Sequence, residues 1–133
     1  LTYLMPDITP SIPQQRQLIQ SYGGGSFRIA GVNHLGSVLI EPDHTYSWFV
    51  EEIFSISLDN LDPIIKDCSR DMLGGAVLLL GTGLEIEEVK PELPIHLRQL
   101  GIGLEVMNTG AACRTFNVLL AEERHVMAAL IAV

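Results

Sequence analysis

The chain reads GIGLEVMNTGAACRTFNVLL from Gly101 to Leu120, and this segment predicts a strand followed directly by a helix. The strand is expected over residues 104–107, where apolar side chains cluster. Asn108 or Thr109 then supplies a side chain suited to cap a helix, which runs to about Glu122. A strand joined to a helix by a short turn is the repeating unit of α/β folds.

The same alternation continues on both sides of this segment. Residues 76–80 form a continuous apolar run, which is typical of a strand covered on both faces. Pro91 opens a helix that closes at Gly101, and residues 125–133 form the last strand. Another short helix, capped by Ser57, precedes these elements. The order strand, helix, strand, helix, strand predicts a parallel or mixed sheet with right-handed crossovers.

The first half of the chain has a different pattern and predicts a β-meander. Residues 1–15 contain three prolines and little periodicity, so we expect an extended or disordered arm there. We then expect strands over residues 17–22, 26–30, 35–41 and 45–50, with turns at residues 23–25 and 31–34. Residues 16–133 are therefore expected to form a single α/β domain.

Composition restricts the class of partner. The formal net charge is −8 and the isoelectric point is near 4.8, which argues against binding to nucleic acid or to an anionic membrane. The apolar runs are too short to cross a membrane, and we recognise no secretory signal. Two cysteines, Cys68 and Cys113, are too few for a disulfide-stapled domain and are expected to be free thiols. We therefore expect a soluble, cytoplasmic protein.

The segment from Gly101 to Leu120 resembles one protein family closely, and so do Gly36-Ser37-Val38-Leu39 and Leu79-Leu80-Gly81-Thr82-Gly83. The family is that of the third assembly factor of mitochondrial respiratory complex I, with its bacterial and archaeal relatives of unassigned function. The likeness extends over nearly the whole chain from Tyr22 onward. Members usually carry Asp where this chain has Asn108, a difference that removes a charge but keeps a capping group.

This resemblance implies a three-layer α/β fold with a mixed central sheet, flanking helices and a packed β-hairpin layer. It also implies a scaffold role, in which the protein binds respiratory-complex assembly proteins while membrane-arm subunits assemble. The location implied is the cytoplasm, or the mitochondrial matrix in a eukaryote, at the inner membrane through a partner. The family supplies no catalytic residue and no cofactor to carry over.

The candidate site lies where two neighbouring strands end in glycine-containing turns. Open α/β sheets bind ligands there, because glycine lets the backbone approach and a capped helix offers free amides to an anion. Arg114 is expected to face solvent, opposite the apolar face of its helix, with Cys113 at the edge of that face. The candidate ligand or partner surface comprises Gly81, Thr82, Gly83, Asn108, Thr109, Gly110, Cys113 and Arg114.

Each of these residues also has a purely structural interpretation. The glycines fit tight turns, Arg114 can pair with a nearby acid, and Cys113 can be an inert core residue instead of a reactive thiol. The four histidines do not have the spacing of metal ligands, so no metal and no catalytic residue is expected. Trp48 and Phe49 fit the core, although an exposed aromatic side chain there would suit a partner.

The sequence therefore favours a non-catalytic binding or scaffold domain, which the resemblance narrows to an assembly factor for a membrane respiratory complex. The alternative is an enzyme or binder of a small anionic molecule that uses the strand ends near Thr82 and Thr109. A third hypothesis is an oligomeric structural protein that associates only with itself.

Overall fold

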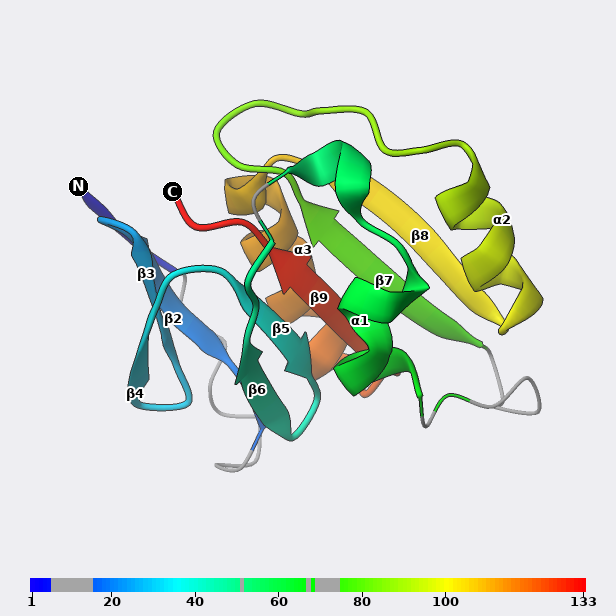
Figure 1. Cartoon of the computed structure of the whole chain (residues 1–133). Coiled ribbons are helices and arrows are strands. Elements are labelled where there is room, and N and C mark those ends of the chain that lie inside the picture. The colour runs from blue at the N-terminus through cyan, green and yellow to red at the C-terminus, as the bar shows by residue number, and fades with distance from the viewer. Residues whose placement is uncertain (6–15, 51, 67, 69–74) are drawn as a thin grey trace.

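A computed structural model describes residues 1–5, 16–50, 52–66, 68 and 75–133 of the chain (Figure 1). Most of the arm expected over residues 1–15 lies outside the described residues. Its first residues form a strand, β1 (Thr2–Leu4), that pairs with β2 (Ile19–Gly23).

A four-stranded antiparallel sheet forms the N-terminal layer, with the order β1-β2-β3-β4. The turn predicted at residues 23–25 is present between β2 and β3 (Ser26–Ile29). The turn predicted at residues 31–34 is wrong, because β4 occupies Val32–Leu35 and pairs with β3. The chain reverses instead at Ala30 and Gly31, whose φ values of 49° and 81° suit a two-residue hairpin turn.

The second sheet has five strands in the order β6-β5-β9-β7-β8. Its central strands are β9 (Val126–Leu130) and β7 (Ala76–Gly81), which run parallel to each other and to β8 (Ile102–Met107). The hairpin of β5 (Val38–Glu41) and β6 (His44–Ser47) is antiparallel and adds to the edge of β9. The predicted mixed central sheet is confirmed, and β5 and β6 belong to it instead of continuing the meander.

Helices cover both faces of the five-stranded sheet (Figure 1). The shorter helices α1 (Leu58–Ile65) and α2 (Glu92–Gln99) lie on one face, and α3 (Thr109–Ala121) lies on the other. A one-turn 3-10 helix, η2 (Ile53–Ser55), precedes α1. The predicted three-layer α/β architecture is confirmed. Within the described residues, no helix is long and apolar enough to span a bilayer.

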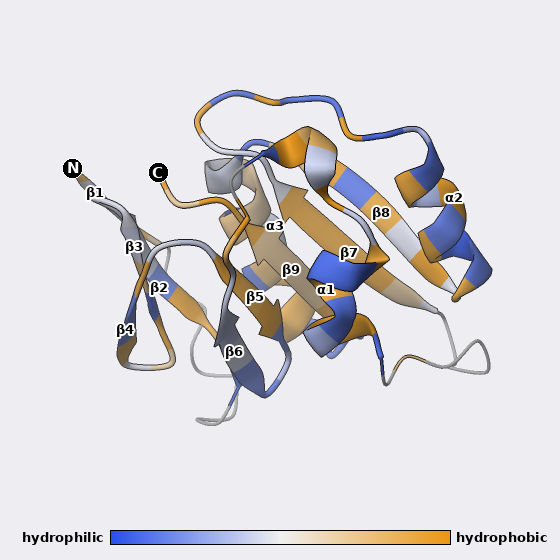
Figure 2. Cartoon of the chain, in the orientation of Figure 1, coloured by the Kyte–Doolittle hydropathy of each residue, from blue (hydrophilic) through white to orange (hydrophobic). Residues whose placement is uncertain are grey.

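The core has two halves, separated by the five-stranded sheet. Along β9, Val126, Ala128 and Leu130 contact the half that contains α3, whereas Met127 and Ala129 contact the half with α1 and α2. This alternation follows the two-residue period of a strand buried on both faces. Figure 2 shows the same distribution, with hydrophobic colour concentrated on β5, β7 and β9.

The four-stranded sheet packs against α3, and the buried side chain of Asn117 bonds the two together. The Ile19 backbone N–H donates to Oδ1 of Asn117 at 2.9 Å, and Nδ2 of Asn117 donates to the Ile19 carbonyl at 2.8 Å. Asn117 is only 3% exposed, so these bonds are shielded from water. The side-chain amide of Asn117 thus gives the Ile19 backbone the acceptor and the donor that a neighbouring strand would supply.

Candidate functional site

Two turns, one after β7 and one after β8, bring the predicted site residues together at the carboxyl end of the central sheet. In the register of these parallel strands, Gly81 is opposite Met107. The Thr82 N–H donates to the Met107 carbonyl at 2.9 Å, and the Thr109 N–H donates to the Gly83 carbonyl at 2.8 Å. The two predicted segments therefore lie side by side.

The hydroxyl of Thr82 holds its own turn together. It donates to the Glu85 carbonyl at 2.7 Å and accepts from the Glu87 N–H at 3.1 Å. Only 2% of Thr82 is exposed, so this side chain faces into the protein. Its hydroxyl shapes the loop and does not project toward a ligand.

The hydroxyl of Thr109 is used in the same way, but over a longer range. It accepts from the Gly83 N–H at 2.9 Å and donates to the Ile131 carbonyl at 2.8 Å. Thr109 is fully buried. One side chain thus connects the turn after β7, the start of α3 and the segment after β9.

Gly81 is required by packing. A Cβ atom at this position would lie 2.9 Å from Cα of Thr109 and 3.0 Å from Cδ2 of Leu130. The absence of a side chain lets the first turn of α3 sit directly on the end of β7. For this glycine the structural interpretation therefore explains the residue fully.

Of the two residues predicted to cap α3, Asn108 is the N-cap. Its Oδ1 accepts from the Ala111 N–H at 2.9 Å, which satisfies one of the free amides of the first helical turn. Asn108 therefore caps the helix without adding a negative charge there.

Cys113 is completely buried and does not belong to the surface on which it was predicted. Burial raises the pKa of its thiol to about 12, and the positive charge of Arg114 offsets only part of that effect. A thiol with this pKa is protonated at neutral pH, so it is a poor nucleophile. Cys113 behaves as a small apolar core residue beside Phe116, which belongs to the same half of the core.

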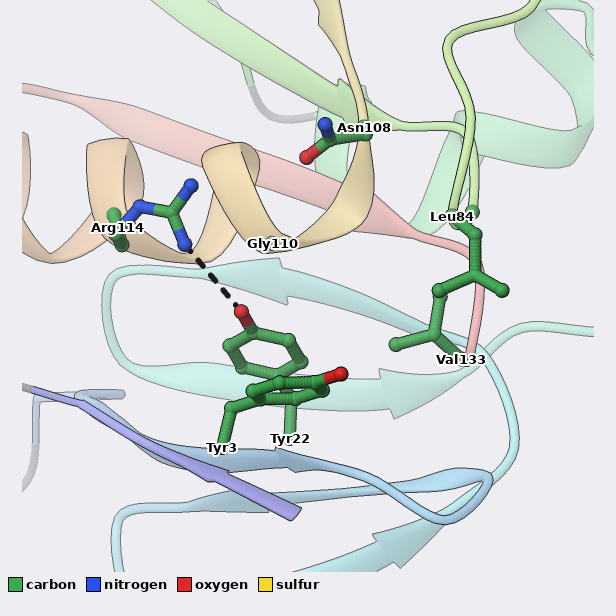
Figure 3. Close-up of a pocket in the computed structure, with 8 residues that line it drawn as sticks. Tyr3, Tyr22, Leu84, Asn108, Gly110, Arg114 and Val133 are labelled. Atoms are coloured by element: carbon green, nitrogen blue, oxygen red, sulfur yellow. Dashed lines mark hydrogen bonds between the residues drawn. The ribbon is translucent and has the colours of Figure 1, made fainter. Parts of the chain in front are cut away.

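Arg114 is exposed, as its helical phase predicts, and its head group lies beside the four-stranded sheet. Its Nη1 donates to Oη of Tyr22 at 3.4 Å, and the Tyr22 ring stacks on Tyr3 with centroids 5.0 Å apart (Figure 3). The predicted ion pair with an acid is not found for Arg114 among the described residues, where Arg16 and Asp43 form the salt bridge.

These side chains line a pocket of about 170 Å³. Its walls are Tyr3, Tyr22, Gly83, Leu84, Asn108, Gly110, Arg114 and Val133 (Figure 3). Pockets that hold metabolites usually measure about 300–1,000 Å³, so this one suits a carboxylate or phosphate group and not a whole substrate. Gly110 helps to shape it, because a Cβ there would lie 2.7 Å from the Tyr22 hydroxyl.

Half of this pocket was not foreseen from the sequence. Tyr3 and Tyr22 come from β1 and β2, Leu84 from the loop after β7, and Val133 from the segment after β9. None of them belongs to a motif, and only the packing of the two sheets brings them to Arg114. The signal that could have indicated Tyr22 is its place next to the Gly23-Gly24-Gly25 turn, where an aromatic residue ends a strand.

The two neighbouring aromatic residues Trp48 and Phe49 have opposite environments. Trp48 is 5% exposed and its indole N–H donates to the Asn60 carbonyl at 3.0 Å, which confirms the prediction of a core residue. Phe49 is 92% exposed, so the same prediction is wrong for Phe49. In the part of the chain that the structure describes, no group of three or more His, Cys, Asp or Glu side chains is arranged to hold a metal ion.

Comparisons with known proteins agree on one family. Residues 19–131 match the family model described as a protein of unknown function, DUF498/DUF598. An uncharacterized protein of Rhodobacter capsulatus is 38% identical over 85% of this chain and 82% of its own length. NADH dehydrogenase [ubiquinone] 1 alpha subcomplex assembly factor 3 of Xenopus tropicalis is 33% identical over 85% of this chain, which spans 60% of that protein.

The fold has solved relatives as well. The crystal structure of an outer membrane protein from Bartonella henselae matches with a TM-score of 0.78 and 38% sequence identity. The match covers 90% of this chain and 98% of that one. This fold is therefore also found in a solved protein of similar sequence.

Proposed function

Because the chain belongs to the DUF498/DUF598 family, whose eukaryotic members include assembly factors of NADH dehydrogenase, we propose that it is a non-catalytic protein-binding domain and an assembly factor for a membrane respiratory complex. The support comes from the similarity to the assembly factors. The bacterial relative from Rhodobacter capsulatus is uncharacterized and indicates no function. The domain would act at the membrane through its partner.

The observation that carries this proposal is that most polar side chains at the carboxyl end of the sheet are bonded within the protein and are not free to bind a substrate. Substrates of α/β enzymes bind there, but the hydroxyls of Thr82 and Thr109 are bonded internally and Cys113 is buried. The exposed residues that line the pocket are Tyr3, Asn108, Arg114 and, across from Arg114, the 76% exposed Leu84. A charged anchor beside an apolar contact suits a protein surface better than a reaction centre.

Affinity capture from the native cell tests this function. Cytosol and gently solubilised membranes would be analysed separately by mass spectrometry. We expect respiratory-complex subunits or another assembly protein to be enriched, and Arg114→Glu to reduce that enrichment at least about tenfold. Arg124→Glu is the matched control, because Arg124 is exposed just beyond the other end of α3.

The melting temperature distinguishes a lost contact from a lost fold. Arg114 is exposed and has one long hydrogen bond, so Arg114→Glu should leave the melting temperature within about 2 °C of the wild type. Equal capture by the wild type and Arg114→Glu would remove Arg114 from the contact surface. Capture of no partner at all would overturn the protein-binding function.

The second candidate function is binding of a small anion, and the pocket around Arg114 favours it. The guanidinium forms no ion pair among the described residues, and the Tyr22 hydroxyl and Asn108 line the same space. A thermal-shift screen of small carboxylates and phosphates tests this alternative. A ligand present at 100 times its Kd adds about 2.7 kcal/mol of stability, and that gain should vanish in Arg114→Gln.

Light scattering would detect a protein that associates only with itself.

A further inference from the structure

The loop over residues 82–91, which joins β7 to α2, has a groove on each side. One groove of about 350 Å³ separates it from η2 and is lined by Glu52, Phe54, Glu87 and Ile131, among others. The other, of about 710 Å³, lies toward α2 and the end of β8. Glu87 lines both grooves, so they adjoin across the loop, which arches over the ends of β7 and β8 in Figure 1.

The side chains around these grooves are unusually apolar for a solvent-exposed loop. Phe54 is 56% exposed, Ile86 is 65% exposed, and Leu84 between the grooves and the Arg114 pocket is 76% exposed. Val89, Val106 and two prolines continue the apolar wall toward α2. Apolar side chains gathered beside grooves mark a surface that another molecule covers.

The negative charges around the grooves indicate which charge the bound molecule carries. Glu52, Glu85, Glu87 and Glu88 are all exposed, and Lys90 is the one basic residue described within the loop over residues 82–91. Among the residues described for the chain, no basic side chain lines either groove. A complementary partner therefore presents lysine or arginine next to its apolar side chains.

We propose that these two grooves bind one segment of a partner protein in which apolar residues alternate with lysine or arginine. The inference rests on the proposed protein-binding function and adds the chemistry of the partner. Nucleic acid and anionic lipid are repelled by the same glutamates. A second copy of this chain is disfavoured as well, because each copy has a net charge of −8 and would bring like charges together.

The Arg114 pocket and the grooves together orient the segment. Arg114 lines the small pocket with Leu84 and Gly83, whereas Glu52 and Glu87 line the groove beside η2. A partner segment therefore places an acidic or carbonyl group toward Arg114 and its basic residues over the grooves. Reversing the segment would set like charges against each other at both ends.

Site-specific photocrosslinking in the native cell tests the proposal. The full chain would carry p-benzoylphenylalanine in place of Phe54, or in place of the 52% exposed Val118 on α3 as the control. We expect position 54 to crosslink a partner peptide with more Lys and Arg than Asp and Glu, and position 118 not to do so. Glu87→Lys should lower the yield about fivefold, whereas Glu122→Lys, an equal charge change at the far end of α3, should not.

Several results would overturn the inference. These are a crosslinked peptide that is acidic, a peptide from a second copy of this chain, or a yield that Glu87→Lys leaves unchanged. If affinity capture recovers a partner but position 54 crosslinks nothing, the grooves are not the contact and the protein-binding function stands. If neither experiment recovers a protein, the proposed function fails together with the inference.

Discussion

At the start of α3, the Thr109 hydroxyl connects three segments that are distant in the sequence. Replacing it in Thr109→Val keeps the shape of the side chain but removes the partner of the buried Gly83 N–H and of the partly buried Ile131 carbonyl. We expect a loss of about 2–4 kcal/mol in the free energy of unfolding, because each unpaired buried group costs about 1–3 kcal/mol.

Thr109→Ser is the control for this substitution, since it keeps the hydroxyl and removes only a methyl group. Its expected loss is about 1 kcal/mol. Urea unfolding of both variants measures the difference. Equal stability of the Val and Ser variants would mean that the hydroxyl does not hold these segments together.

Burial of Cys113 predicts a pH dependence of stability. The unfolded chain releases the thiol proton near its ordinary pKa of 9.0, whereas the folded protein keeps it up to about 12. Above the lower value the unfolded state binds fewer protons, so stability is complete below it and falls as pH rises toward the higher one. The difference in urea midpoint between wild type and Cys113→Ala, followed from about pH 7.5 to about 10, should therefore shrink. A constant difference would contradict this assignment.

The individual site residues were only partly predictable from the sequence. Asn108 as a cap and Arg114 as an exposed residue follow from local rules, since capping and helical phase depend on neighbours along the chain. The roles of Thr82 and Thr109 do not follow from such rules. The Thr82 hydroxyl donates to the Glu85 carbonyl of its own loop, and the Thr109 hydroxyl donates to the Ile131 carbonyl after β9. Both carbonyls are positioned only by the fold.

At the scale of elements, the hydrogen bonds of Asn117 indicate that β2 is held in place by α3. Asn117→Leu fits the apolar surroundings but leaves the N–H and carbonyl of Ile19 unpaired inside the protein. We expect a loss of about 2–4 kcal/mol and faster hydrogen exchange of the Ile19 amide. Asn117→Asp should be less stable at neutral pH than at low pH, because the ionised carboxylate is buried without a cation. Unchanged exchange at Ile19 would show that β2 is held by apolar contacts alone.

Elements were easier to predict where the residues are locally distinctive. The apolar run at residues 76–80 gave β7, which is almost fully buried. The segment from Gly101 to Leu120 gave β8 and α3 with errors of a few residues, because a capping residue separates the strand from the helix. β1 and β4 were missed. Their side chains are mostly exposed, so neither strand imposes a regular apolar pattern on the sequence.

At the scale of the whole molecule, the sheet order predicts a gradient of local stability. All five residues of β9 are buried between β5 and β7, whereas β4 is an exposed edge of the other sheet. Hydrogen exchange under native conditions should therefore be slowest in β9 and fastest in β1 and β4. Amide exchange followed by NMR measures this order. Protection of β4 equal to that of β9 would contradict it.

The α/β class and the mixed sheet were predictable, but the order of the strands was not. β5 pairs with β9 in an antiparallel register, and this pairing joins the two halves of the chain. Periodicity reports how each strand is buried, but it does not report which strand lies beside it. The same limitation hid the pocket, whose residues come from the four-stranded sheet, from α3 and from the segments after β7, β8 and β9.

The central place of β9 has a consequence for how the protein folds during its synthesis on the ribosome. β5 ends at Glu41, yet β9, which closes the gap between β5 and β7, begins only at Val126. While the intervening residues are synthesised, the facing edges of β5 and β7 stay unpaired, and unpaired apolar edges attract other nascent chains. The facing edges of β5 and β7 therefore stay open to other chains until β9 has been synthesised and pairs with both.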